Sequence, residues 1–318
     1  MICLEHAEIP ELPNPHRGKV RDSYDLGDGR RVIVATDRQS AFDRMLSPVP
    51  RKGEVLTRLS RYWFETTANI CPNHFIAQPD PNVMIVRSLK MIEVEVVVRG
   101  YLTGSTGTSI WQQYRRGVRA FGGTVLPDGL GKNSRLPQLV VTPTSKAPLG
   151  EHDVPMDEAG IVAAKLCTEA EWRRIKGASL AVFTHAREIA AQRGLILVDT
   201  KYEFGLDGRG DVVLADEVHT PDSSRYWLAG SYAGRVGAGE EPEMLDKEYL
   251  RLWIIAHCRP YDEPIPPIPP EVLAELSARY VRVCEAITGE TLAPPPAGIA
   301  PTARIRENLK KHLPQYFK

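Results

Sequence analysis

The chain has 318 residues, which is about two average domains' worth of sequence and enough to bury a core. It carries 40 basic and 40 acidic side chains, so its formal net charge is zero. A chain without net charge exerts no long-range attraction on nucleic acid or an anionic membrane, and we expect neither as a partner. Its apolar runs reach only about five residues, against the roughly 18 needed to cross a bilayer.

The cysteines and the N-terminus favour a cytoplasmic protein. Five cysteines are scattered along the chain without a C-x-x-C pair, which argues against a disulfide framework and a structural zinc site. The first residues show no cationic segment followed by an apolar one, as a secretion signal would. We therefore expect reduced and mostly buried thiols.

The zero net charge conceals a gradient along the chain. Residues 1–150 carry 20 basic and 14 acidic side chains, whereas residues 151–318 carry 20 basic and 26 acidic ones. The cationic excess of the first part either reflects chance surface composition or lines a site for an anionic ligand.

The N-terminal part predicts an antiparallel hairpin and a helix. Residues 24–26 and 31–36 are rich in strand formers and flank a Gly-Asp-Gly turn, the pattern of two paired strands. A helix is expected over residues 54–69, with strands at 83–87 and 93–99.

A long amphipathic helix and a second hairpin are expected in the middle of the chain. Thr168, with Glu171 three residues later, forms a capping box, and apolar residues recur at helical spacing from there to Gly194. Strands at residues 195–199 and 211–215 enclose a glycine-rich turn.

The C-terminal part begins with a stiff connector, because six prolines lie between residues 259 and 270. A helix is expected over residues 271–288, with Pro270 near its first position and Gly289 past its end. Another proline-rich loop follows at residues 292–301.

Common catalytic motifs are absent from the sequence. It contains no G-x-x-x-x-G-K-[ST], no H-E-x-x-H and no G-x-S-x-G, so a P-loop nucleotidase, a zincin and an α/β-hydrolase lose their main support. The chemistry is therefore sought in charged clusters of predicted loops.

Two such clusters border the first predicted hairpin. Residues 18–22 (Gly-Lys-Val-Arg-Asp) can fold over phosphates, although a solvated charged loop has the same composition. Residues 36–43 directly follow a strand, where α/β proteins place ligands. A helix cap by Asp37 or Ser40 is the alternative interpretation.

An arginine ends the predicted strand at residues 93–99 and is followed by a turn rich in glycine and hydroxyl groups. Arg99 with Ser105 would form an anion clamp with an added hydroxyl donor. An arginine that extends from the strand end into solvent is the competing interpretation.

A group of carboxylates is expected around the second hairpin. Alternation along an extended strand puts Asp199, Lys201 and Glu203 on one face, and the hairpin brings Asp216 close to Glu203. Gathered carboxylates repel one another unless a cation lies between them, and Mg²⁺ takes one or two carboxylates plus phosphate oxygens. A surface ladder of ion pairs with Lys201 is the alternative. Residues 220–227 add hydroxyls and an arginine suited to a phosphate or a carboxylate.

Together these clusters resemble the SAICAR synthetase family (phosphoribosylaminoimidazole-succinocarboxamide synthase) of purine biosynthesis. The resemblance rests on six blocks that occur in family order. The blocks are residues 18–22, 34–43, 94–105, 142–146, 199–205 and 216–225.

The resemblance implies an ATP-dependent ligase. ATP phosphorylates the carboxylate of the aminoimidazole ribonucleotide CAIR, and the amine of L-aspartate displaces phosphate from this acyl phosphate to give SAICAR, ADP and phosphate. A carboxylate is a poor electrophile, so catalysis consists mainly of positioning and charge neutralisation by Mg²⁺ and protein cations. The partners implied are these small molecules, and the chain is expected as a monomer or a small homo-oligomer.

The resemblance also implies roles for individual residues. The expected ATP contacts are Gly18, Lys19, Val20, Arg21, Glu95, Val97 and Lys201, and the expected Mg²⁺ ligands are Glu203 and Asp216. The expected substrate contacts are Asp37, Arg38, Ser40, Asp43, Arg99, Ser105, Lys146, Ser224 and Arg225, with His152 on the loop of Lys146. Catalytic roles are expected for Asp199, Lys201 and Arg225.

The fold that the resemblance implies is α+β, with an N-terminal antiparallel β lobe and a larger α/β lobe, related to ATP-grasp and protein-kinase-like folds. The expected domains are a nucleotide-binding lobe (1–90), a catalytic lobe (91–258) and a C-terminal extension packing on the core (259–318). Two other functions stay open. A small-molecule kinase on this scaffold would not depend on aspartate, and a purine-nucleotide sensor could lose the metal carboxylates that are retained here.

Overall fold

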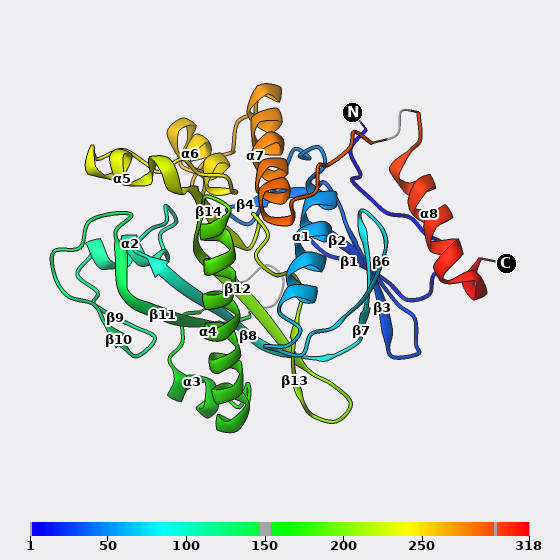
Figure 1. Cartoon of the computed structure of the whole chain (residues 1–318), viewed down its shortest axis with the longest axis horizontal. Helices are drawn as coiled ribbons and strands as arrows, with labels where there is room; N and C mark the ends of the chain where they lie inside the picture. Colours follow the sequence, from blue (N-terminus) through cyan, green and yellow to red (C-terminus); the bar gives the residue numbers. More distant parts are fainter. Residues whose placement is uncertain (1, 147–153, 296–297, 318) are drawn as a thin grey trace. The chain divides into compact units, whose positions relative to one another are not determined.

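The computed structural model describes residues 2–146, 154–295 and 298–317. The chain divides into two compact units, whose helices and strands are labelled in Figure 1. Unit 1 comprises Met1–Glu65, His74–Leu89 and Trp253–Lys318, and unit 2 comprises Thr66–Asn73 and Lys90–Leu252. The segment from residue 259 onward, expected as an extension, is thus part of unit 1; the predicted domain boundaries themselves stay predictions.

Unit 1 contains an antiparallel five-stranded sheet in the order β1-β2-β3-β7-β6. Its strands are β1 (Pro15–Arg17), β2 (Arg21–Asp25), β3 (Arg30–Ala35), β6 (Phe75–Asp80) and β7 (Val83–Arg87). The first predicted hairpin is confirmed, since Tyr24 pairs with Val32 across the Gly-Asp-Gly turn. Both residues are buried because alternate side chains of each strand face the core of this unit.

A short hairpin and a helix follow β3. Strands β4 (Gln39–Ala41) and β5 (Arg44–Leu46) enclose Phe42 and Asp43, which both have positive φ, as in the two-residue turns that match the twist of paired strands. Helix α1 (Lys52–Thr66) begins two residues before the predicted start. The buried Asp37 accepts the backbone N–H of Gly53 at 3.0 Å, so it satisfies a donor of the first turn of α1 from a distant part of the sequence.

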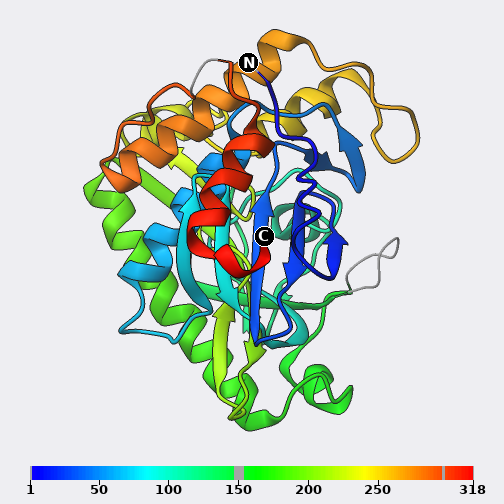
Figure 2. The ribbon, with the colours of Figure 1, turned by 90° about the vertical axis from the view of Figure 1, so that its right-hand side faces the viewer.

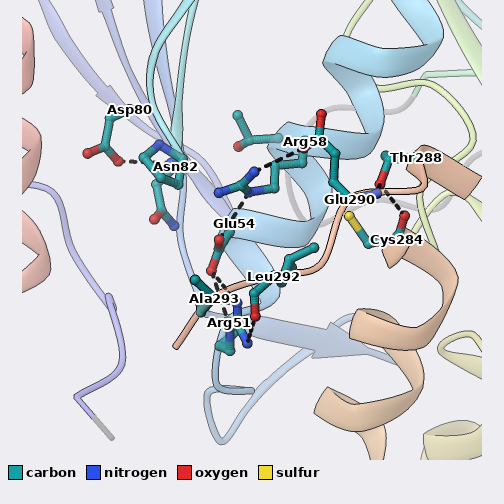
Figure 3. Close-up of polar contacts among 12 residues, drawn as sticks. Arg51, Glu54, Arg58, Asp80, Asn82, Cys284, Thr288, Glu290, Leu292 and Ala293 are labelled. Atoms are coloured by element: carbon teal, nitrogen blue, oxygen red, sulfur yellow. Dashed lines mark hydrogen bonds and ion pairs between the residues drawn. The ribbon is translucent and has the colours of Figure 1, made fainter. Parts of the chain in front are cut away.

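Helix α7 (Pro270–Thr288) confirms the predicted C-terminal helix, with Gly289 in the left-handed conformation at its end. Figure 3 shows the polar contacts that connect the following segment with α1. Arg58 bonds both Glu54 and Glu290, at 3.0 and 3.2 Å, and Arg51 donates to the carbonyl oxygen of Ala293 at 2.9 Å. These contacts hold the segment after α7 against α1.

The chain ends with α8 (Pro301–His312) and the short 3₁₀ helix η1 (Pro314–Tyr316). Figure 2 shows α8 lying over the sheet of unit 1, and α8 contacts β6. Ile305, Leu309 and Leu313 join the apolar core formed with the sheet and the N-terminal segment. The fully buried carboxylate of Asp80 on β6 receives two hydrogen bonds from Arg304, at 3.0 and 3.1 Å.

Unit 2 is built on a second antiparallel sheet, with order β11-β8-β12-β13 and with β14 also paired to β12. Its strands are β8 (Lys90–Tyr101), β11 (Arg135–Ser145), β12 (Leu195–Leu206), β13 (Val212–Ala215) and β14 (Ser224–Leu228). Helix α4 (Glu169–Gln192) packs against β8 and β12, and the predicted capping box of Thr168 and Glu171 is present. The predicted second hairpin is confirmed by the pairing of β12 with β13.

The remaining elements of the described chain are short. They are α2 (Ile110–Arg115), β9 (Ala120–Phe121), β10 (Thr124–Val125), α3 (Glu158–Ala163), α5 (Ala229–Gly237) and α6 (Glu248–His257). No helix in the described part is long and apolar enough to cross a membrane. Helices combined with two five-stranded antiparallel sheets confirm the predicted α+β class, whereas a relation to ATP-grasp or kinase-like folds stays a prediction.

The anchoring of α8 leads to a prediction. Arg304→Ala leaves the buried Asp80 carboxylate without its cationic partner, so we expect a loss of about 3 kcal/mol in the free energy of unfolding. The matched control is Arg306→Ala on the same helix, whose ion pair with Glu11 is exposed and should contribute little to stability. Urea unfolding of both variants measures the difference; equal losses would contradict the role of Asp80.

Candidate active site

A polar cavity of about 220 Å³ lies in unit 2, over the end of β8, the middle of β12, the start of β14 and the start of α6. Its walls combine cations, carboxylates and hydroxyl groups. They are formed by Val97, Arg99, Thr106, Thr108, Ser109, Asp199, Thr200, Lys201, Pro221, Asp222, Ser223, Ser224, Arg225, Asp246, Lys247 and Arg251. Five of these side chains are cationic, which suits an anionic ligand.

The alternation predicted for β12 is confirmed. Asp199 and Lys201 both line the cavity, and Lys201 bonds the next residue of the same face, Glu203, at 2.5 Å. The alternative of an ion-pair ladder is confirmed in part, because Lys201 does pair with Glu203, but Asp199 and Glu203 are buried and the pairs do not form a surface ladder. Pairing with β8 puts Arg99 opposite Asp199.

Two arginines share the carboxylate of Asp199. Arg225 bonds it at 2.6 Å, and Arg99 lies 3.6 Å from it and also bonds the hydroxyl of Thr142. Arg99 is therefore buried and paired, and its extension into solvent is excluded. Burial lowers the pKa of Arg99 to about 10, with Arg225 acting in the same direction, so Arg99 stays protonated at neutral pH.

Arg225 has a second carboxylate partner. Glu248, at the start of α6, lies 3.2 Å from its guanidinium and also contacts Arg251. Burial alone would raise the pKa of Glu248, but Arg225 and Arg251 lower it to about 2. Beside it, burial raises the pKa of Asp246 to about 7, although Asp246 accepts the backbone N–H groups of Tyr226 and Glu248. Arg225 is thus held in one orientation from two sides.

Lys201 is surrounded by carboxylates. Its Nζ lies 2.8 Å from Glu95, 2.5 Å from Glu203 and 3.9 Å from Asp216. Burial alone would lower the pKa of Lys201, but these carboxylates raise it well above its ordinary value. Burial would raise the pKa of Glu203, but Lys201 and Lys146 hold it well below its usual range. Lys201 is therefore a fixed cation and Glu203 a fixed anion at neutral pH.

The turn between β13 and β14 is strained and tightly bonded. Asp216 and His219 both have positive φ, at 62° and 50°, a conformation that side chains with a Cβ rarely adopt. The buried His219 bonds the hydroxyl of Tyr202 through Nε2 at 2.7 Å, and its carbonyl accepts the hydroxyl of Tyr226. Burial lowers the pKa of His219 to about 3, so it is neutral and holds the turn rather than moving protons.

Glu203 and Asp216 fit a magnesium ion that phosphate oxygens also ligate. Glu203 pairs in register with Ala215, the residue next to Asp216, and both carboxylates approach the same Lys201 amine. Among the described residues there is no group of three or more side chains that could hold a metal alone. This donor set agrees with Mg²⁺, which usually keeps one or two protein carboxylates and takes its other ligands from phosphate or water.

Comparisons with known proteins identify the family of the chain. Residues 14–268 match the family model described as SAICAR synthetase. The chain is 52% identical over 291 residues to the phosphoribosylaminoimidazole-succinocarboxamide synthase of Legionella pneumophila (strain Paris), covering 91% of this chain and 92% of that one. The chain belongs to the SAICAR synthetase family.

Solved structures of the family have the same fold. The SAICAR synthase of Saccharomyces cerevisiae complexed with SAICAR is 31% identical, with a TM-score of 0.76 over 92% of this chain and all of that one. A SAICAR synthetase in complex with ADP is 25% identical, with a TM-score of 0.68 over 88% of this chain and 100% of that one. The predicted two-part SAICAR synthetase fold is therefore confirmed.

The predicted phosphate loop of this family member belongs to unit 1, and Arg38 braces it. The Arg38 guanidinium donates to the carbonyl oxygens of Gly18 and Lys19 and bonds the carboxylate of Asp22 at 2.8 Å. The predicted contact of Arg38 with substrate, like the nucleotide contacts of Lys19, Val20 and Arg21, stays a prediction. The structure gives Arg38 a supporting position behind the loop.

The other predicted substrate contacts are spread over both units. Asp37 is buried beneath α1, and Asp43, on the turn of the β4–β5 hairpin beside Ser40, lies 3.5 Å from Lys19. In unit 2, the hydroxyl of Ser224 bonds Thr200 at 2.7 Å and Ser105 approaches Glu248. Lys146 bonds Glu203 at 2.5 Å, and His152 lies outside the described residues.

Sequence reasoning missed the cavity wall that α6 contributes. Lys247 bonds Asp222 at 3.3 Å, and Arg251 contacts Glu248, which in turn orients Arg225. Lys247 directly precedes α6 and Arg251 lies in its first turn, so their spacing of four residues puts them on one face of the helix start, a signal that the sequence does contain. The sequence could not show that this face meets the cavity.

The lowered pKa of Glu248 leads to a prediction for stability. Folding favours the ionised form of Glu248, which therefore contributes about 3 kcal/mol to the free energy of unfolding. This contribution is complete above pH 4.5 and is lost as the pH falls toward 2. Glu248→Gln should therefore destabilise the protein at pH 7, and the difference from the native protein should shrink below pH 4.5.

Urea unfolding between pH 7 and pH 3 measures this difference. The matched control is Glu240→Gln, which breaks an exposed ion pair with Arg235 and should change stability by less than about 1 kcal/mol. A difference between Glu248→Gln and the native protein that does not depend on pH would contradict the assignment.

Proposed function

We propose that the chain joins CAIR and L-aspartate at the cavity of unit 2, using ATP, to give SAICAR, ADP and phosphate. The observation that carries this proposal is the position of Lys201. This residue lines the cation-rich cavity and also contacts the carboxylates of Glu203 and Asp216. An anion site and a candidate metal site therefore adjoin, as transfer of a phosphoryl group to a bound carboxylate requires.

The ribonucleotide binds at the arginine side of the cavity. Its phosphate and carboxylate are anions, and Arg99 and Arg225 offer planar guanidinium groups, with Ser224 as a hydroxyl donor. Lys247 and Arg251 add positive charge from α6. These groups keep a fixed geometry, so binding orders few side chains.

Asp199 acts mainly by aligning the arginines. Its carboxylate is shared by Arg225 at 2.6 Å and Arg99 at 3.6 Å, so it holds both guanidinium groups in place. Its charge keeps two neighbouring guanidinium groups from repelling each other. We therefore assign Asp199 the role of a positioning residue in the catalytic cluster.

The nucleotide phosphates bind at the Lys201 side. Glu203 and Asp216 would hold Mg²⁺, which when bound neutralises phosphate oxygens. Lys201 stays protonated and faces the same region, so it stabilises negative charge that develops as the phosphoryl group moves. Lys146, which bonds Glu203, supplies a further cation.

The reaction needs no nucleophile from the protein, because the substrates supply both nucleophiles. The carboxylate oxygen of CAIR attacks the terminal phosphorus of ATP, and ADP leaves. The aspartate amine next attacks the acyl carbon, the amine loses a proton, and inorganic phosphate leaves with the C–O bond electrons. Fixed cations stabilise each anionic leaving group, which accounts for the concentration of Arg99, Lys201 and Arg225 at the cavity.

Several parts of the proposal rest on the sequence. Gly18, Lys19, Val20 and Arg21 in unit 1 are proposed for the ATP phosphates, and Glu95 and Val97 on β8 for the adenine. The partners are the small substrates, with a monomer or small homo-oligomer as the assembly. All five cysteines are free thiols, which supports a reducing compartment such as the cytoplasm.

The test of the proposed function is the dependence on aspartate. Incubation with CAIR, ATP and Mg²⁺ should give SAICAR, detected by mass, only when L-aspartate is present. Asp216→Asn should lower kcat by about 100-fold or more while the melting temperature stays close to that of the native protein. A phosphorylated product formed without aspartate would identify a small-molecule kinase, and turnover unchanged in Asp216→Asn would refute the metal assignment.

The position of Arg225 leads to a separate kinetic prediction. Arg225→Ala should raise the KM for CAIR at least about tenfold more than the KM for ATP, because it removes a contact at the ribonucleotide side. Arg173→Ala, on the exposed face of α4, is the matched control and should change neither constant. An equal rise of both KM values would mean that Arg225 serves elsewhere.

A further inference from the structure

A second cavity of unit 2 has no role in the proposed reaction. It has a volume of about 480 Å³, more than twice that of the first cavity. It is lined by Gly100, Arg135, Leu136, Pro137, Gln138, Leu139, Thr184 and Arg187. Three segments contribute to it: β8, the start of β11 and the middle of α4.

The cavity results from an irregularity of β11. Arg135 pairs with Tyr101 and Val140 pairs with Arg99, so five steps along β11 match only two along β8. The additional residues, 136–139, bulge out of the ladder and form one wall. Gly100 lies on β8 between the two paired positions and has no side chain to fill the space.

The charged groups that line this cavity are both cationic. Two guanidinium groups, from Arg135 and Arg187, line it, and none of the described residues that line it is acidic. Within the described parts of the chain, neither side chain has an ion pair or a hydrogen bond, whereas Arg99, Arg225 and Arg251 of the first cavity are all paired. Both guanidinium groups also lie near the hydroxyl of Tyr101. Burial raises the pKa of this hydroxyl, and the two arginines act in the opposite direction.

Two unpaired cations that face one concavity repel each other until an anion lies between them. Arginine offers a planar fork of donors, and two forks match the oxygens of one phosphate group. The amide of Gln138 and the hydroxyl of Thr184 add donors on the walls. We propose that this cavity is a second anion site, which binds the phosphate dianion either free or as the phosphate group of a small metabolite.

This site is separate from the proposed substrate cavity. Consecutive residues of a strand point to opposite faces of the sheet, and here Arg99 lines the first cavity while Gly100 lines the second. None of the described residues lines both cavities, so a ligand in one does not occupy the other. The proposal of this second site therefore does not depend on the proposed function of the first cavity.

The test is a calorimetric titration of the full chain with inorganic phosphate and, separately, with ribose 5-phosphate. The native protein should show two classes of sites. The double variant Arg135→Ala with Arg187→Ala should weaken phosphate binding to the class of the second cavity at least about tenfold and leave the affinity of the first cavity unchanged. Arg225→Ala should instead weaken binding to the class of the first cavity. Ribose 5-phosphate that binds the Arg135 class more tightly than phosphate identifies a phosphate monoester as ligand, and equal affinities identify free phosphate.

Two matched variants keep the test decisive. Arg193→Ala removes an exposed arginine from the end of the same helix and should leave both classes unchanged. The double variant of Arg135→Lys with Arg187→Lys keeps the charge, and it should bind with intermediate affinity because it lacks the forks. Two unchanged classes in the double alanine variant, or an equal loss in Arg193→Ala, would overturn the proposal.

Discussion

The pairing of β8 with β12 brings opposite charges together in a buried place, and the site depends on this pairing. Asp199 and Glu203 are both buried on β12, and an unpaired buried carboxylate is costly. Each is therefore matched by cations, Asp199 by two arginines and Glu203 by two lysines. Removal of any one partner leaves a buried charge behind, which keeps the whole cluster in one arrangement.

The cluster is rigid at its ends for different reasons. At the arginine end, Glu248 and Asp199 hold Arg225 from two sides. At the other end, the turn of Asp216 is strained, and the hydrogen bonds of the buried His219 keep it in place. Fixed charges of this kind need little reorganisation during a reaction, which suits a ligase whose catalysis consists of positioning and charge neutralisation.

The same strand also separates two environments. On one face of β8, Arg99 belongs to a cluster in which every charge has a partner. Beside Gly100, on the other face, two arginines have no partner within the described residues. The first arrangement needs its partners because it is buried, whereas the second is open enough for water to solvate its cations until an anion binds.

The sequence by itself determined what depends on local order along the chain. The capping box at Thr168, the left-handed Gly289, the hairpins and the alternation of Asp199, Lys201 and Glu203 follow from neighbouring residues, and motif order identified the family. Only the tertiary structure decided which distant charges meet. It assigned Asp37 to a helix end, Arg38 to the loop it braces, and Lys247 and Arg251 to the cavity wall. Such contacts depend on how strands and helices pack. The sequence shows where a charged residue stands, but it does not show which distant residue will become its partner in the folded protein.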